Sequence, residues 1–411
     1  MFDPFSTALS ALNANAAAIS VTGDNLANLN TIAFKGSRVS FDDLVTQFVT
    51  EGLEIGAGVG RPSTSRQYIQ GSVEVTGTGL DAAIQGNGFF IVRDAADSQL
   101  FTRSGNFTTD AQGNLVTMAG HNVQGWPAVS GVATPTGPIS DITLPTSGLL
   151  APIATTQIAM RLNLDAGQAA GATFAVPAEV VDSLGATHVI TFNFTKTSPT
   201  DWDYDITIPG ADLTSGTAGT PSSVLTGTVS FGPDGQITAP PAPGLVPVAI
   251  TGFTNGASDV AMDWSLYQGP DSMLTQFAQQ SAVSSVSQDG EVPAEMINLE
   301  ITQGGLVVAR FTGGREQVVA QIAVASIANP GSLASAGNNA FRLTSNSAAP
   351  AIGPAGTGGR GEVRGAALES STVDIASEFT RLIRYQRAYQ ANSRVVTTAD
   401  EIAQETLNLK R

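Results

Sequence analysis

The two ends of the chain carry the same helical pattern, and the long stretch between them is patterned as β-structure. Near the N-terminus, mostly apolar residues recur at alternating steps of four and three: Phe5, Leu9, Leu12, Ala16, Ile19, Gly23 and Leu26. The alternation returns near the C-terminus, at Ile375, Phe379, Leu382, Gln386, Tyr389, Ser393 and Val396. Such steps keep side chains on one face of an α-helix. We therefore expect two amphipathic terminal helices that pair, so that the chain leaves and returns at one end of the molecule.

The flanking residues set the expected limits of these helices. Asp3-Pro4 is a good start for the first helix, because Asp caps free N–H groups and Pro fits the first turn. The helix is predicted to end near Ala27, before a loop at 28–36. Ser371-Thr372-Val373-Asp374 predicts the cap of the second helix, in which Glu378 precedes Arg381 at a pairing distance.

Turn residues divide the middle of the chain into short strands. Residues 83–92 predict a strand, an Asn-Gly turn and a second strand, and residues 110–114 predict the turn of a hairpin. Further strands are expected at 187–194, 201–208, 299–301, 306–311 and 318–327. Two Gly- and Pro-rich stretches, 127–148 and 353–365, predict a domain crossing and a flexible hinge before the last helix.

The net charge of −16 is distributed very unevenly. Residues 104–309 hold seventeen acidic and two basic residues, a net charge of −15, whereas the rest of the chain has a net charge of −1. An acidic body resists nonspecific association and does not bind nucleic acid. The balanced ends can pack against copies of themselves with little repulsion.

Composition and the first residues bear on where the protein works. The chain has 411 residues, 42% of them apolar, with 44 Gly, 21 Pro and no Cys. That length supports two or three domains, and the Gly and Pro content suits many turns. We expect no membrane insertion, since no run of about 18 apolar residues occurs. The absence of Cys fits an exported chain, and the N-terminus lacks the pattern of a Sec signal.

Motifs for chemistry have simpler structural interpretations here. Asp201-x-Asp203-x-Asp205 resembles the start of a calcium loop, but Ile206 stands where the loop needs Gly, so a strand with an acidic outer face is predicted. His121 and His188 are the only histidines and cannot build a usual zinc cluster without Cys. The arginines from Arg381 to Arg394 predict a salt-bridged helix face. We expect a structural protein rather than an enzyme, with no cofactor and no metal.

Several segments resemble a known family. Residues 8–13 and 24–35 are similar to the N-terminal signature of bacterial flagellar rod and hook proteins, although Ala33 stands where the family commonly has Gly. Residues 386–392 and 397–401 resemble the matching C-terminal signature, and 79–90 and 101–107 resemble segments found across this axial family. Residues 288–290, 331–339 and 365–369, together with the inserted acidic block, resemble the hook proteins in particular.

This resemblance implies a mainly β, multidomain fold with coiled-coil-like α-helical termini. Residues 1–68 with 364–411 would form an inner helical domain, 69–148 with 286–363 a β-rich domain, and 149–285 an inserted acidic β-domain. The helices would pair in the inner domain, with the β-domains stacked outward. A distal-rod or hook-junction protein of the same family is the alternative.

The implied function is that of a subunit which polymerises into the extracellular hook, the flexible universal joint between rotary motor and filament. Its partners would be copies of itself, the rod, the hook cap, the hook-filament junction proteins and the flagellar export apparatus, with no nucleic acid. Export would use the flagellar type III channel. The expected polymerisation interface comprises Phe5, Leu9, Leu12, Ala16, Ile19, Leu26, Asn28, Asn30, Phe34, Phe379, Leu382, Gln386, Arg387, Tyr389, Asn392 and Val396.

Overall fold

Two helices at the ends of the chain and many short strands make up the fold. The computed structural model describes residues 4–44, 47–50, 53–55, 58–129, 131–145 and 148–408. The chain divides into two compact units: unit 1 holds Met1–Ser147, Ile297–Arg310 and Gly314–Arg411, and unit 2 holds Gly148–Met296 with Phe311–Gly313. The predicted fold class, mainly β with paired terminal helices, is confirmed. The predicted division into three domains stays a prediction.

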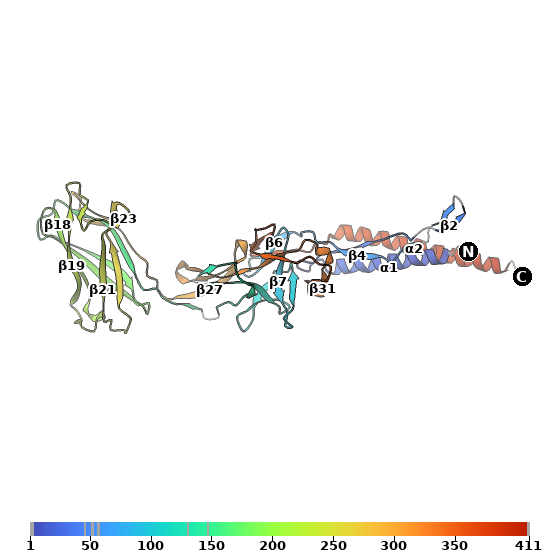
Figure 1. Cartoon of the computed structure of the whole chain (residues 1–411), viewed down its shortest axis with the longest axis horizontal. Helices are drawn as coiled ribbons and strands as arrows, with labels where there is room; N and C mark the ends of the chain where they lie inside the picture. Colours follow the sequence, from blue (N-terminus) through green and yellow to red (C-terminus); the bar gives the residue numbers. More distant parts are fainter. Residues whose placement is uncertain are drawn as a thin grey trace. The chain divides into compact units, whose positions relative to one another are not determined.

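The two terminal helices of unit 1 lie side by side (Figure 1). Helix α1 runs from Pro4 to Ala27 and α2 from Ile375 to Asn408. Asp3, the expected cap of α1, lies outside the described residues. The cap of α2 is Asp374, whose Oδ1 accepts a hydrogen bond from the Ser377 backbone N–H at 2.7 Å. The predicted capping segment is therefore in the right place, but its last residue, Asp374, and not Ser371, caps the N-terminus of α2.

Strands of unit 1 come from both halves of the chain. They are β1 Ser37–Ser40, β2 Gln47–Thr50, β3 Leu53–Ile55, β4 Ser63–Arg66, β5 Val73–Val75, β6 Ala82–Gln85, β7 Phe89–Arg93, β8 Gln99–Thr102, β9 Phe107–Thr109, β10 Leu115–Thr117, β11 Asn122–Val129, β12 Val132–Ala133, β13 Ser140–Asp141, β28 Leu306–Phe311, β29 Glu316–Ile322, β30 Val324–Ser326, β31 Ala334–Gly337, β32 Ala340–Arg342, β33 Ala351–Gly353, β34 Glu362–Gly365 and β35 Ala367–Glu369. The part of the largest sheet that these strands form runs in the order β28-β29-β11-β7-β8-β32-β31. Strand β27, Ala294–Ile301, begins in unit 2 and ends in unit 1.

Two predicted turns had different outcomes. The hairpin at 110–114 is confirmed, because β9 and β10 pair antiparallel on either side of it. The Asn-Gly turn at Asn87-Gly88 separates two strands as predicted, but β6 and β7 do not pair with each other. Strand β6 pairs with β34, and β7 pairs with β8, β11 and β30. The sequence marks the turn, whereas the pairing depends on strands more than 200 residues further along the chain.

The glycine-rich stretch 353–365 was predicted to be a flexible hinge, and that prediction was wrong. Strand β33 ends at Gly353, and β34 lies within the stretch and pairs with β6 in the register Gly365↔Ala82. A Cβ atom on Gly365 would lie 1.6 Å from the Ile301 backbone oxygen. Glycine is needed here for a close approach of backbones. The crossing at 127–148 likewise contains strand residues of β11, β12 and β13.

Unit 2 is a β-sandwich with one hydrophobic core. Its strands are β14 Leu149–Leu150, β15 Gln157–Asp165, β16 Thr173–Val181, β17 Thr187–Lys196, β18 Asp201–Pro209, β19 Pro221–Phe231, β20 Ile237–Ala239, β21 Leu245–Ile250, β22 Val260–Ser265, β23 Tyr267–Gln268, β24 Asp271–Ser272, β25 Leu274–Phe277 and β26 Ala282–Gln288. One sheet has the order β16-β17-β18-β19-β20, and the other contains β21-β22-β15-β25 with β26 on β15. A single cluster of buried residues draws on both sheets and includes Trp202 and Trp264.

Strand β18 confirms the interpretation of the acidic repeat. Trp202, Tyr204 and Ile206 are buried, while Asp203 between them is exposed. Thr228 donates a hydrogen bond to Asp203 Oδ1 at 2.7 Å across the sheet. The alternation of a strand explains the spacing of the aspartates.

A buried histidine on β17, His188, lies between two aspartates. His188 Nε2 lies 2.9 Å from Asp182 Oδ2, and His188 Nδ1 lies 3.1 Å from Asp212 Oδ2. Burial acts to raise the pKa of Asp182, but hydrogen bonds from His188, Asn255 and two backbone N–H groups outweigh it and lower this pKa to about 2. Within the described residues, no group of three or more His, Cys, Asp or Glu side chains could hold a metal ion.

This aspartate makes the stability of unit 2 sensitive to acid. Because the pKa of Asp182 is lowered on folding, its contribution is complete above its ordinary pKa near 4 and is lost as the pH falls toward 2. We expect Asp182→Asn to reduce the free energy of unfolding at pH 7 by about 2 kcal/mol, with the difference shrinking below pH 4. Urea unfolding followed by tryptophan fluorescence, in a Trp126→Phe background that leaves Trp202 and Trp264 as the emitters, measures the free energy of unfolding at both pH values. Exposed Asp271→Asn is the control; a difference from wild type that stays constant down to pH 2 would refute the assignment.

Candidate functional site

The predicted interface residues on α1 lie beside, and not within, the buried face of that helix. The buried side chains of α1 are small or polar: Ala8, Ala14, Ala18, Thr22 and Asn25. Leu9 is 57% exposed, Ala16 and Gly23 are exposed, and Leu12, Ile19 and Leu26 are half-buried. The apolar spacing therefore marks a face that the single chain leaves partly uncovered.

On helix α2 the predicted interface residues are divided between covered and exposed positions. Its covered positions include Glu378, which is buried, and Leu382, Asn392 and Val396, which are half-buried. Phe379 is 47% exposed and Tyr389 41% exposed, and Gln386 and Arg387 are also exposed. Glu378 pairs with Arg381 at 2.6 Å, as its spacing predicted. We call the predicted positions on both helices the seam face: Phe5, Leu9, Leu12, Ala16, Ile19 and Leu26 with Phe379, Leu382, Gln386, Tyr389 and Val396.

Three predicted residues lie in the segment that follows α1. Asn28 closes the end of α1, where its backbone N–H bonds Asp24 O at 3.2 Å and its side chain accepts a hydrogen bond from Thr31 Oγ1 at 3.1 Å. Asn30 is exposed and lines a cavity of about 360 Å³. Phe34 is only 6% exposed, and its backbone oxygen accepts a hydrogen bond from the Thr372 N–H at 3.1 Å. Phe34 thus serves the fold of the single chain.

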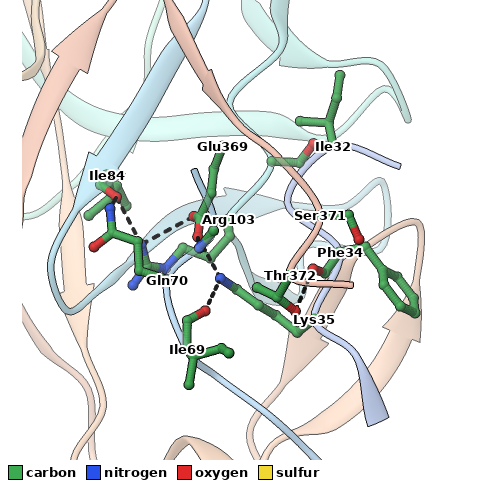
Figure 2. A network of polar contacts seen from close by, with 12 residues as sticks. Ile32, Phe34, Lys35, Ile69, Gln70, Ile84, Arg103, Glu369, Ser371 and Thr372 are labelled. Atoms are coloured by element: carbon green, nitrogen blue, oxygen red, sulfur yellow. Dashed lines mark hydrogen bonds and ion pairs between the residues drawn. The ribbon is translucent and has the colours of Figure 1, made fainter. Parts of the chain in front are cut away.

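Sequence reasoning missed a buried network next to these residues, which we call the polar joint: Lys35, Arg103 and Glu369 (Figure 2). Lys35 Nζ lies 2.6 Å from Glu369 Oε1, and Arg103 Nη1 lies 3.4 Å from Glu369 Oε2. All three residues are at least nine-tenths buried. Lys35 and Glu369 each end a segment that resembles the family signature, but nothing in their spacing shows that they meet.

Backbone groups complete the polar joint. Lys35 Nζ also donates to Ile69 O at 2.6 Å, and Arg103 donates to Ile84 O at 3.0 Å and to Gly86 O at 2.5 Å. The Gly71 N–H donates to Glu369 Oε1 at 2.7 Å. Burial lowers the pKa values of Lys35 and Arg103, and the Glu369 carboxylate opposes that effect for both. The carboxylate is therefore the group that makes two buried cations tolerable.

The loop between α1 and the polar joint contains a strained residue. Ala33 has φ +56°, a left-handed conformation, and its backbone N–H bonds Glu369 O at 2.8 Å. This is the position at which the family commonly has Gly, which adopts such a φ without the steric cost of a Cβ atom.

We expect Ala33→Gly to raise the free energy of unfolding by about 0.5–1 kcal/mol, even after loss of one buried methyl group. Urea unfolding followed by the helical circular dichroism signal measures the change. Ala18→Gly, at a buried position inside α1, is the matched control and should destabilise the chain by about 1 kcal/mol. If both substitutions destabilise equally, Ala33 is not strained.

Matches to known families cover most of the chain. The model described as flagella basal body rod protein matches residues 5–35, and that of the flagellar hook protein FlgE/F/G D1 domain matches 83–161. The model of the flagellar basal body protein FlaE D2 domain matches 157–291, and that of the flagellar basal body rod FlgEFG protein C-terminal matches 364–409. The first and last of these matches contain the seam face.

Relatives with similar sequences extend over the full length. The flagellar hook protein FlgE of Salmonella typhimurium is 33% identical over 433 residues, covering 99% of this chain and 100% of the relative. The flagellar hook protein FlgE of Rhizobium meliloti is 31% identical over 423 residues and covers 100% of both chains. The crystal structure of Helicobacter pylori flagellar hook protein FlgE2 is similar in fold, with a TM-score of 0.50 and 14% identity over 71% of this chain and 99% of that chain.

Proposed function

Because the chain belongs to the flagellar hook protein family and is a structural subunit of the polymeric hook, we propose that its copies assemble through the seam face. The observation that carries the proposal is the exposure of large apolar side chains on both terminal helices. Leu9, Phe379 and Tyr389 are each more than 40% exposed although they follow a strict helical spacing. A regular apolar stripe that the single chain covers only in part favours packing against another surface.

The energetics favour many copies over one. Burying a Leu or Phe side chain gains about 1.5–3 kcal/mol, and a helix in water with few partners is only marginally stable. Several such side chains on two helices could offset the entropy cost of association in a regular array. The weak net charge of the chain outside residues 104–309 adds little repulsion between adjacent ends.

The acidic unit 2 supports a different kind of contact. It carries fourteen acidic and two basic residues, so extended dry contacts between its copies would cost desolvation and repulsion. We propose that the helices and the β-rich part of unit 1 form successive inner layers, with the inserted domain outside them. Wet, sliding contacts between outer domains would let the tube bend, while the tight inner layer resists twist.

Family membership also supports the wider assignment. We propose that the rod, the hook cap and the hook-filament junction proteins are the neighbours of this polymer, and that subunits reach the cell exterior through the flagellar export apparatus. Among the described residues, no helix is long and apolar enough to cross a membrane. The proposed contacts with these partners rest on family membership. The seam face supports only the proposed contacts between copies of the chain.

Electron microscopy of the purified, polymerised chain tests the proposal. We expect tubes that are curved, because a hook must bend as it turns. Straight, rigid tubes would instead favour a rod component, and the absence of any ordered polymer over a range of salt and protein concentrations would contradict assembly through the seam face.

A further inference from the structure

We propose that the polar joint is an orientation lock: Lys35, Arg103 and Glu369 hold the paired helices at one fixed setting on the β-strands of unit 1. The role of the lock would be to transmit torque from the helices to the strands, and this role rests on the proposed function. Its geometry belongs to the single chain and can be tested there.

Both chain connections to the helices pass through the polar joint. Lys35 follows the loop after α1, and Glu369 ends β35, shortly before α2 begins at Ile375. Arg103 follows β8 in the largest sheet of unit 1. Figure 2 shows the three side chains converging from these separate segments. One carboxylate therefore joins both helix connections to the β-strands.

Neighbouring backbone bonds align the two connections with each other. The Ala33 N–H donates to Glu369 O at 2.8 Å, and the Thr372 N–H donates to Phe34 O at 3.1 Å. The Gly36 N–H donates to Thr372 Oγ1 at 3.0 Å. The two connections thus form one structure, whose attachment to unit 1 includes the buried charges.

Charge and direction make this attachment specific. An apolar contact is non-directional and tolerates a small rotation, but a buried charge that loses its partner costs several kcal/mol. Two cations share one carboxylate here, and Arg103 Nε has no hydrogen-bond partner among the described residues. A rotated setting would leave Lys35 or Arg103 without its charge partner at a buried position, so a single arrangement is favoured.

Stability and orientation can be separated by substitution. Glu369→Leu alone would leave two buried cations and unfold much of unit 1. Replacing all three charges with apolar residues of similar size, Lys35→Met, Arg103→Met and Glu369→Leu, removes the directional bonds while filling the space. Replacing a buried group of ion pairs by apolar side chains of similar volume often leaves the stability of a protein unchanged or raises it. The triple variant should therefore stay folded, although the backbone groups of Ile69, Ile84, Gly86 and Gly71 lose their bonds to these side chains.

Orientation is measured by the distance between two spin labels on the unpolymerised full chain. The chain contains no Cys, so Thr380→Cys on α2 and Ser98→Cys beside β8, both at exposed positions, carry the only labels. The matched control is Arg310→Met with Glu300→Leu, which removes a partly exposed ion pair of unit 1 with a 2.7 Å separation. We expect one narrow distance distribution for the wild type and the control, and one at least about twofold broader for the triple variant.

Three results would overturn the lock: a broad distribution in the wild type, an equally narrow one in a folded triple variant, or a triple variant that fails to fold, which would make the charges a requirement of folding. Since no polymer is used, each result is independent of whether copies form tubes. Failure of the wild type to polymerise would count against the proposed function alone.

Discussion

Leu9→Asp is expected to abolish polymerisation while leaving the single chain folded. Leu9 is 57% exposed in the single chain, so the substitution removes few contacts there and should change the free energy of unfolding by less than about 0.5 kcal/mol. In a polymer held together by the seam face, the same change buries a carboxylate without a partner in every subunit, at a cost of several kcal/mol. Sedimentation and electron microscopy measure polymer, and circular dichroism measures the fold.

Asn13→Asp is the matched control for this prediction. It adds the same charge to the same helix, at an exposed polar position outside the seam face. Tubes should form from the Asn13 variant and not from the Leu9 variant. Normal tubes from the Leu9→Asp variant would show that the seam face is not the polymerisation interface.

Gly365→Ala is expected to destabilise unit 1 strongly. The added Cβ would lie 1.6 Å from the Ile301 oxygen and 2.6 Å from the Ile301 carbonyl carbon, both backbone atoms that cannot rotate away. Gly365 is also held in place by the pairing of β34 with β6, in which its partner is Ala82. Ala82 is itself closely packed, because a Cβ atom on Gly105 would lie 1.7 Å from the Ala82 oxygen. Either the strands separate or the register shifts, and we expect a loss of about 2–4 kcal/mol in urea unfolding.

Gly331→Ala is the control for the close approach. A Cβ on Gly331 would have no atom within 4 Å, and its backbone does not need a left-handed conformation. The free energy of unfolding of the Gly331→Ala variant should stay within about 0.5 kcal/mol of the wild-type value. Equal stability of both variants would mean that the segment 353–365 yields easily, as a flexible hinge would.

The sequence was sufficient where a pattern is local. Helical spacing predicted α1 with its end near Ala27, and the alternation of Trp202, Tyr204 and Ile206 predicted β18 with its acidic outer face. Turn residues around Asp110 predicted the hairpin of β9 and β10. Each of these features depends on neighbours within a few residues, so the chain itself carries the information.

Features that join distant segments were not predictable. The Gly-rich stretch 353–365 has the composition of a hinge, and only the pairing of β34 with β6 shows why small residues are needed there. Lys35 and Glu369 are 334 residues apart, and no spacing rule connects them. The seam on α1 was read correctly as one helix face, but its separation from the buried Ala8 and Ala18 depends on what packs against the helix.

Protection of a single cysteine in the polymer tests the central claim most directly. Phe379→Cys places the only thiol of the chain on the seam face, at a position that is 47% exposed in the single chain. We predict rapid reaction with a maleimide in the single chain, strong protection in assembled tubes, and recovery when the tubes are dissociated. Equal labelling rates before and after assembly would contradict the account, because the helices would then hold no neighbouring copy.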